Sequence, residues 1–225
     1  AHTANPFADP GNGTGAYNIY KVLYDAVAEG LTEDDYTTTD WEGCKGMINR
    51  GEIGTMVLGS WAYSQMQAAG DHPEDIGYMS FPITVNGKQY ASAGPDYAFA
   101  INNASSDDNK LASMIFIKWM TEKSGFSYNE AGIPIATDDD KYPDLYAAFE
   151  GIDYVADDAA LEGEEDLMSL LNADSELNFN SGGDKKVQAI VEHAANKDMS
   201  FDEIMNDWNA KWTDAQELNG VEILY

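Results

Sequence analysis

The sequence predicts a helix-rich α/β protein with few short strands, and three observations lead to this prediction. Apolar residues recur at helical spacing in several segments of the 225-residue chain. Brief β-branched runs lie between glycine and proline breaks, as short strands do. The pair Asn86-Gly87, with β-capable residues on both sides, is typical of a hairpin turn.

The first part of the chain predicts an irregular lead-in followed by helices. Residues 1–15 are rich in Pro, Gly, Asn and Asp and lack periodicity. Apolar residues at helical spacing over 17–27 predict a helix that ends at Gly30. Asp40 is the expected N-cap of a second helix, because its short carboxylate can accept from free backbone N–H groups.

The stretch Gly51–Tyr63 carries the first functional hypothesis. Its apolar run, Thr55–Leu58, is brief and partly β-branched, which predicts a buried strand. Trp61 and Tyr63 follow the next glycine break, at the start of a helix that continues to Ala69. Aromatic residues at the exit of a buried strand lie where open α/β sheets place their ligand crevices. Trp61 is therefore the first candidate binding residue.

The middle of the chain predicts two more strands and a buried helix. Strands are expected over 75–81 and 97–101, on either side of the hairpin. A long helix is expected to begin at 105–108. Its run Met114–Met120 is apolar almost all round, which predicts burial.

The last third is expected to be helical. Short helices are predicted over 142–149 and 164–171, and a helical face is formed by Val187, Ile190, Val191 and Ala194. Ser200 and Glu203 match a capping box. The final helix is expected to bury Phe201, Ile204, Met205, Trp208 and Trp212, and Trp41 and Trp119 are also expected in the core.

Several motifs occur in the order seen in one known family. They are Asn49–Val57, Gly59-Ser60-Trp61, Ser80-Phe81-Pro82, Gly94-Pro95, Ala100-Ile101-Asn102, Phe116 to Trp119 and Gly132 to Pro134. From about Tyr17 to Asp214 the chain thus resembles the maltose-binding-protein-like sugar-binding proteins of ABC importers, extracellular solute-binding protein family 1. Gly54 and Thr55 depart mildly from the Ala-Ala or Ala-Met that is usual in the family.

The resemblance implies an incomplete lobe of a periplasmic-binding-protein-like (class II) fold. The family's two-lobed proteins are roughly twice as long, and the match is to their C-terminal half. By this resemblance residues 1–82 begin the second lobe, residues 83–136 cross into the first lobe, and residues 137–225 form the helical end of the second lobe.

The resemblance also implies a set of sugar-binding residues. Trp61 is expected to stack on a sugar ring, with Tyr63 as a second aromatic candidate; the alternative is that one of them packs in the core. Gly94 would let the backbone approach a ligand, and Asp96 would accept bonds from hydroxyls, unless the two form an ordinary turn. Asp184 is a weaker candidate, with an N-cap as the favoured alternative.

Composition excludes several classes of function. With 40 Asp and Glu against 12 Lys and Arg, the net charge of −28 disfavours binding to nucleic acid or to anionic membrane surfaces. No run is apolar enough to span a membrane. The single cysteine, Cys44, excludes a disulfide within the chain. No zinc or EF-hand spacing and no Gly-x-Ser-x-Gly elbow occurs, so neither a metal nor another cofactor is expected.

The preferred hypothesis is oligosaccharide binding for uptake, without catalysis. The resemblance implies an extracellular or periplasmic protein, held at the membrane by a lipid anchor upstream, with the permease subunits of an ABC transporter as partners. The alternative is a carbohydrate-active enzyme or accessory domain that uses an acidic pair, although abundant carboxylates make such pairs uninformative. A third possibility is an interaction domain with an acidic face. A chain without a signal peptide is expected to be a mature or cut form.

Overall fold

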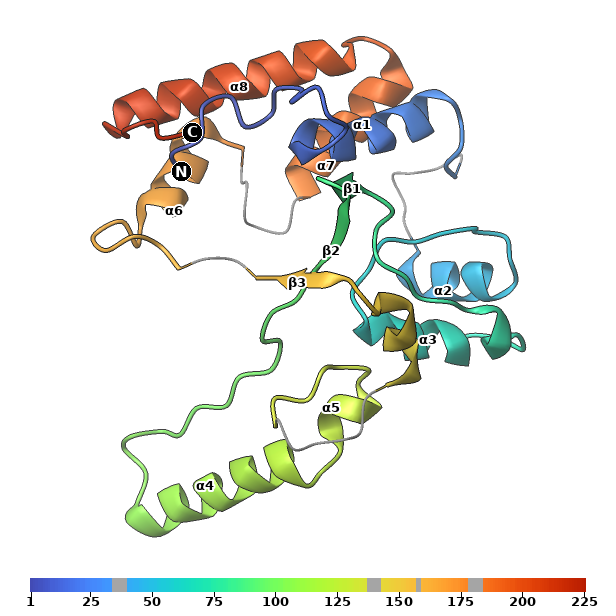
Figure 1. The fold of residues 1–225 in the computed structure, drawn as a ribbon, viewed down its shortest axis with the longest axis vertical. Coiled ribbons are helices and arrows are strands. Elements are labelled where there is room, and N and C mark those ends of the chain that lie inside the picture. The colour runs from blue at the N-terminus through green and yellow to red at the C-terminus, as the bar shows by residue number, and fades with distance from the viewer. Residues whose placement is uncertain (34–39, 137–142, 157–158, 178–183) are drawn as a thin grey trace. The chain divides into compact units, whose positions relative to one another are not determined.

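The computed structural model divides the chain into two compact units, residues 1–38 with 158–225 and residues 39–157 (Figure 1). The residues that it describes are 1–33, 40–136, 143–156, 159–177 and 184–225. The predicted polar loops over 34–39 and 178–183 lie outside the described residues.

The first unit is helical. Its described helices are α1 (Gly15–Ala28), α6 (Leu167–Ser175), α7 (Asp184–Asn196) and α8 (Phe201–Leu218). Helix α1 packs along α7, and α8 contacts the other three. The expected end of α1 is confirmed, because Gly30 follows it with a φ of +71°.

Helix α8 organises the core of this unit. The predicted capping box is present: the Ser200 hydroxyl accepts from the Glu203 N–H, and the Glu203 carboxylate accepts from the Ser200 N–H at 2.8 Å. All five predicted core residues of α8 are buried. Trp208 packs edge-on against Phe7 and Tyr20, with ring centroids 5.3 and 5.6 Å apart.

The chain ends lie together against α8, where Figure 1 marks N and C. The Ala4 N–H donates to the Tyr225 carbonyl at 2.8 Å. The Phe7 N–H donates to the Asn209 side-chain oxygen at 2.9 Å, while the Phe7 ring is fully buried. Residues near the N-terminus therefore complete a core built mainly from the C-terminal third.

The second unit combines short helices with a small sheet. Its elements are α2 (Trp41–Asn49), α3 (Trp61–Ala68), η1 (Pro73–Asp75), β1 (Thr84–Val85), β2 (Lys88–Ser92), α4 (Asp107–Glu122), α5 (Phe126–Asn129), η2 (Asp144–Phe149) and β3 (Asp153–Val155). The sheet order is β1-β2-β3, with β1 and β2 antiparallel and β2 and β3 parallel. The predicted hairpin is confirmed: Asn86 and Gly87, with φ of 51° and 78°, connect β1 to β2.

Helices α2 and α3 form a closely packed pair. Asp40 is confirmed as the N-cap of α2, since its Oδ1 accepts from the Gly43 N–H at 3.0 Å. At the other end of α2, the buried Asn49 amide donates to the Met66 carbonyl and accepts from the His72 N–H, each at 3.1 Å. Both hydrogen bonds reach the end of α3 and the turn beyond it, so Asn49 ties the pair together.

Three of the predicted strands are wrong. Residues 55–58, 75–81 and 97–101 have no strand structure, and the sheet instead uses β3, which the sequence did not suggest. Met56 and Leu58 pack on the small cluster around α3, whereas Val57 is 77% exposed. A short β-branched run favours an extended backbone. An extended backbone becomes a strand only where a neighbouring backbone is available for hydrogen bonding.

The predicted burial of the long helix is also wrong. Helix α4 has no buried residue, and Trp119, expected in the core, is 51% exposed. Its main packing partner among the described elements is the single turn α5. An apolar sequence without a facing element stays exposed.

The predicted fold class is confirmed: the described chain is helix-rich α/β with few short strands. The assignment of residues 83–136 to a first lobe stays a prediction.

Candidate functional site

Trp61 lies at the first position of α3, directly after the irregular loop 51–60. The buried face of α3 consists of Ala62 and Met66, so the Trp61 indole is not part of that core. The side chain is 40% exposed, and its ring centroid lies 5.8 Å from that of Trp41 with an interplanar angle of 52°. An exposed indole supported from one side offers an apolar face to a ligand.

Trp41 is in turn held by a lysine one helical turn along α2. The Lys45 ammonium lies 5.1 Å from the Trp41 ring centroid, which is within cation–π range. It also donates to Glu42 Oε1 at 2.8 Å and to Gln65 Oε1 at 3.2 Å. Although Lys45 is only 8% exposed, its charge is therefore paired, and α2 is joined to α3 beside the two indoles.

This face of α2 and α3 combines the two features that sugars require. The indole of Trp61 suits the C–H surface of a pyranose ring, and the carboxylate of Glu42 is a planar group suited to hydroxyls. The Glu42 side chain is exposed beside the lysine that it pairs with. Trp41, Glu42 and Lys45 were not predicted from the sequence as neighbours of Trp61, although the i, i+4 spacing of Trp41 and Lys45 places them on one helix face.

Tyr63 has a different environment. Its hydroxyl accepts from the Gln67 amide at 3.0 Å, and its ring lies edge-on to Tyr78, with centroids 6.4 Å apart. Tyr78 stacks on Phe149 at 5.2 Å, and burial raises the pKa of the Tyr78 hydroxyl. Tyr63 thus belongs to an aromatic cluster behind α3, while Trp61 points elsewhere, because residues i and i+2 do not share a helix face.

The other predicted site residues lie elsewhere in the chain. Gly94 and Asp96 lie in the irregular, exposed segment between β2 and α4. A Cβ at Gly94 would meet no atom within 4 Å, so open space surrounds it. Asp184 is the first residue of α7, in the other unit, and its side chain lies outside the described residues. Their participation in a binding site stays a prediction.

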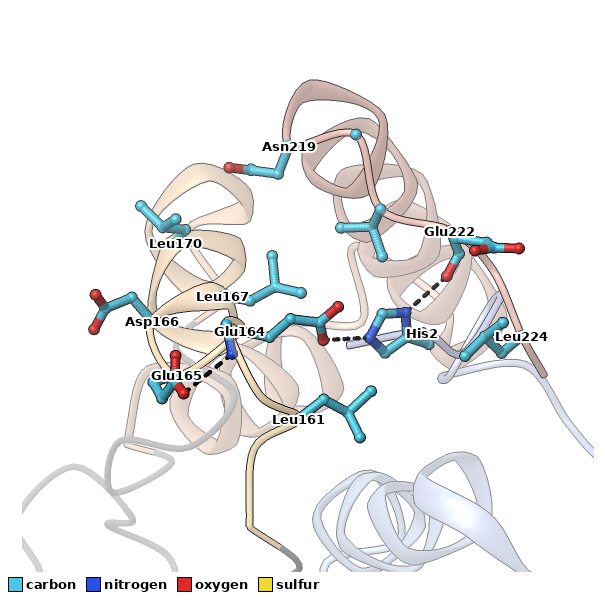
Figure 2. A pocket seen from close by; sticks show the side chains of 13 residues that line it. His2, Leu161, Glu164, Glu165, Asp166, Leu167, Leu170, Asn219, Glu222 and Leu224 are labelled. Carbon is cyan, nitrogen blue, oxygen red and sulfur yellow. Dashed lines mark hydrogen bonds and ion pairs between the residues drawn. The ribbon is translucent and has the colours of Figure 1, made fainter.

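A cavity of about 560 Å³ lies in the first unit, between the start of α6 and the end of α8 (Figure 2). The His2 ring nitrogens lie 2.8 Å from the Glu222 carbonyl and 2.7 Å from Glu164 Oε2. Both partners are acceptors, so only the doubly protonated ring satisfies both, and these bonds raise the pKa of His2. The described lining contains no Trp, Tyr or Phe, which makes this cavity a poor candidate for sugar stacking.

Within the described part of the chain, one group of side chains has metal-ligating chemistry. His72, Glu74 and Asp75 have potential ligand atoms within 4.8 Å of one another around η1. All three are exposed, and nothing else around them points to a bound ion. We therefore assign no metal to this turn.

The chain is similar to known proteins both in sequence and in structure. The sequence model of the family described as "Bacterial extracellular solute-binding protein" matches residues 3–125. No curated protein matches the chain. Among its described residues, the chain has no helix that is long and apolar enough to cross a membrane.

Solved structures from Bifidobacterium animalis subsp. lactis are similar to the chain. A manno-oligosaccharide specific solute binding protein in complex with mannotriose is 55% identical, with a TM-score of 0.85, and the match covers 95% of this chain and 51% of that one. A binding protein of an ABC transporter in complex with mannobiose is also 55% identical, with a TM-score of 0.87, and the match covers 97% and 52%. The chain thus spans about half the length of these relatives.

Proposed function

The chain belongs to the bacterial extracellular solute-binding protein family, and from this premise we propose that it contributes one face of a manno-oligosaccharide site for uptake by an ABC transporter. The similar structures hold mannobiose and mannotriose, and their identity to this chain is 54 to 55%. At this identity, the chemistry of the ligand is expected to be of the same class.

The observation that carries the proposal is the exposed indole of Trp61 on its Trp41 support. A mannose ring has an apolar patch of C–H groups, and stacking on an indole removes this patch from water without disturbing the hydroxyls. The acidic balance of the chain agrees with a neutral ligand, because a net charge of −28 repels anionic ones.

We further propose that α4 packs inside the first lobe of the whole protein, against the part of that lobe that this chain does not span. Residues 97–135 carry a dense set of exposed large apolar side chains: Tyr97, Phe99, Leu111, Met114, Ile115, Phe116, Trp119, Tyr128, Ile133 and Ile135. Such a surface is typical of a buried interface rather than of a free one. Its occupant would be the half of the relatives' length that this chain does not span. This supports the assignment of residues 83–136 to the first lobe.

The finer parts of the function follow from the family. We propose an extracellular location with a lipid anchor upstream, closure of two lobes around the sugar, and docking of the closed form to permease subunits. The family consists of binding proteins rather than enzymes. We therefore expect no release of mannose from mannotriose during prolonged incubation, and release that a single carboxylate substitution abolishes would contradict this.

Titration of the chain with mannobiose and mannotriose tests the proposal, with maltotriose as a comparison sugar. Titration calorimetry measures the affinity of the parent chain and of each variant, and the shift of the Trp61 indole N–H resonance reports weak binding in the chains that keep this residue. We expect Trp61→Ala to weaken binding roughly 10- to 100-fold, since burying a large apolar side chain contributes about 1.5–3 kcal/mol. Trp119→Ala removes another exposed indole, on α4, and should leave the affinity unchanged. If Trp61→Ala binds mannotriose with the same affinity as the parent chain, the proposed stacking role of Trp61 is wrong.

A further inference from the structure

Gly59 lies two residues before Trp61, and its lack of a side chain has a steric reason. Its φ is not positive, so the backbone conformation does not require glycine. A Cβ built on Gly59 would lie 2.5 Å from Nε1 and 2.7 Å from Cδ1 of Trp61. Carbon and nitrogen atoms in contact normally stay about 3.5 Å apart. The pyrrole edge of the indole therefore occupies the space that any side chain at position 59 would need.

The same indole is limited on another side by Trp41. The two ring centroids lie 5.8 Å apart, and Trp41 is itself fixed by the Lys45 ammonium. Lys45 is bound to Glu42 on its own helix and to Gln65 on α3. Residues of both helices thus hold the support against which the Trp61 ring rests.

We propose that Gly59 is a positioning residue for the ligand: it lets the Trp61 indole fold back onto the loop, where Trp41 holds the ring in the plane on which a sugar stacks. The inference rests on the proposed stacking role of Trp61. Its physical basis is preorganisation, because a ring already held in its binding orientation loses less conformational freedom when the ligand arrives. Gly59 acts through Trp61 and need not touch the sugar.

The loop offers a matched control for this proposal. Gly54 lies in the same irregular segment, also lacks a positive φ, and a Cβ at this position would meet no atom within 4 Å. Gly59→Ala and Gly54→Ala thus make the same chemical change in the same loop. Only the first places a methyl group against the indole.

The orientation of the indole can be read without any sugar. Two indoles at this separation give an exciton couplet in circular dichroism, and Trp61→Phe and Trp41→Phe identify the couplet by abolishing it. We expect Gly59→Ala to remove or invert the couplet and to weaken mannotriose binding about 10-fold. Gly54→Ala should change neither signal. An unchanged couplet in Gly59→Ala would overturn the inference.

The two proposals fail in different ways. If Gly59→Ala alters the couplet while both Gly59→Ala and Trp61→Ala bind mannotriose normally, the stacking role of Trp61 is wrong and the sugar does not use this ring. If Trp61→Ala weakens binding but Gly59→Ala does not, Gly59 has no positioning role.

A thermodynamic cycle separates a local clash from a general loss of folding. In the Trp61→Ala background the indole is absent, so Gly59→Ala should cost no stability there, although it does so in the parent chain. If Gly59→Ala lowers the thermal midpoint equally in both backgrounds, glycine is required by the backbone of the loop and not by the indole. This result would overturn the proposal.

Discussion

Helices α8 and α4 are of similar length, with 18 and 16 residues, yet they differ completely in burial. Helix α8 buries eight of its residues, whereas α4 buries none. Both sequences contain large apolar residues and tryptophan, at helical spacing in α8 and as the run Met114–Ile117 followed by Trp119 in α4. The difference is that α8 meets α1, α6 and α7, while α4 meets mainly the short α5. Apolar composition therefore favours burial, but a helix is buried only where another element packs against it.

The largest expected effect comes from removing one tryptophan from each helix. Trp208→Ala should cost about 3–5 kcal/mol of unfolding free energy, because the ring is buried against Phe7 and Tyr20. Trp119→Ala, on the exposed helix, should cost less than about 0.5 kcal/mol. Urea denaturation of both variants measures the difference. Comparable losses would mean that α4 is covered in the chain in solution.

The N-cap serines of α8 and α4 allow the same two helices to be compared, with a smaller expected effect on stability. Ser200 takes part in a capping box on α8, and Ser106 accepts from the Asn109 N–H at 3.4 Å on α4. Ser200→Ala should lower the unfolding free energy of the first unit by about 1 kcal/mol. Ser106→Ala should instead speed hydrogen exchange of the α4 amides alone, since little of the chain depends on that helix. A global loss of stability from Ser106→Ala would contradict this view of α4.

The smallest expected effect concerns pH and the chain ends packed near α8. The Glu222 carbonyl and Glu164 raise the pKa of His2 above its ordinary value of 6.5. The protonated ring therefore stabilises the folded form fully below about pH 6.5, and this contribution is lost as pH rises through the raised pKa. The thermal midpoint should fall more between pH 6 and 8 in the parent chain than in His2→Gln. Identical pH profiles for the two proteins would exclude this role of the imidazole.

Much of the helical structure was predictable because its signals are local. The Asp40 cap, the Ser200–Glu203 capping box and the Asn86-Gly87 turn each involve residues within a few positions of one another. The strands were less predictable, since β3 pairs with β2 across more than sixty residues of chain. Thr55–Leu58 has the composition of a strand but no strand partner among the described residues.

The candidate site shows the same division. The motif around Gly59 and Trp61 was visible in the sequence, and with it the expectation of a stacking aromatic. That Trp41 supports this ring, and that Lys45 joins α2 to α3 beneath it, required the packing of two helices. The role of Tyr63 in ligand binding stays a prediction, and the packing of its ring against Tyr78 was not visible in the sequence.

The sequence by itself determined the N-caps of α2 and α8, the acidic character of the chain and the family motifs, because these depend on neighbouring residues and on composition. Only the tertiary structure decided which apolar faces are covered and how the Trp61 indole is held. Burial and ring orientation depend on residues far apart in the chain, and no local pattern records whether such a partner is present. Gly59 illustrates both levels: its place in the motif is read from the sequence, but its steric reason is seen only when the indole lies over it.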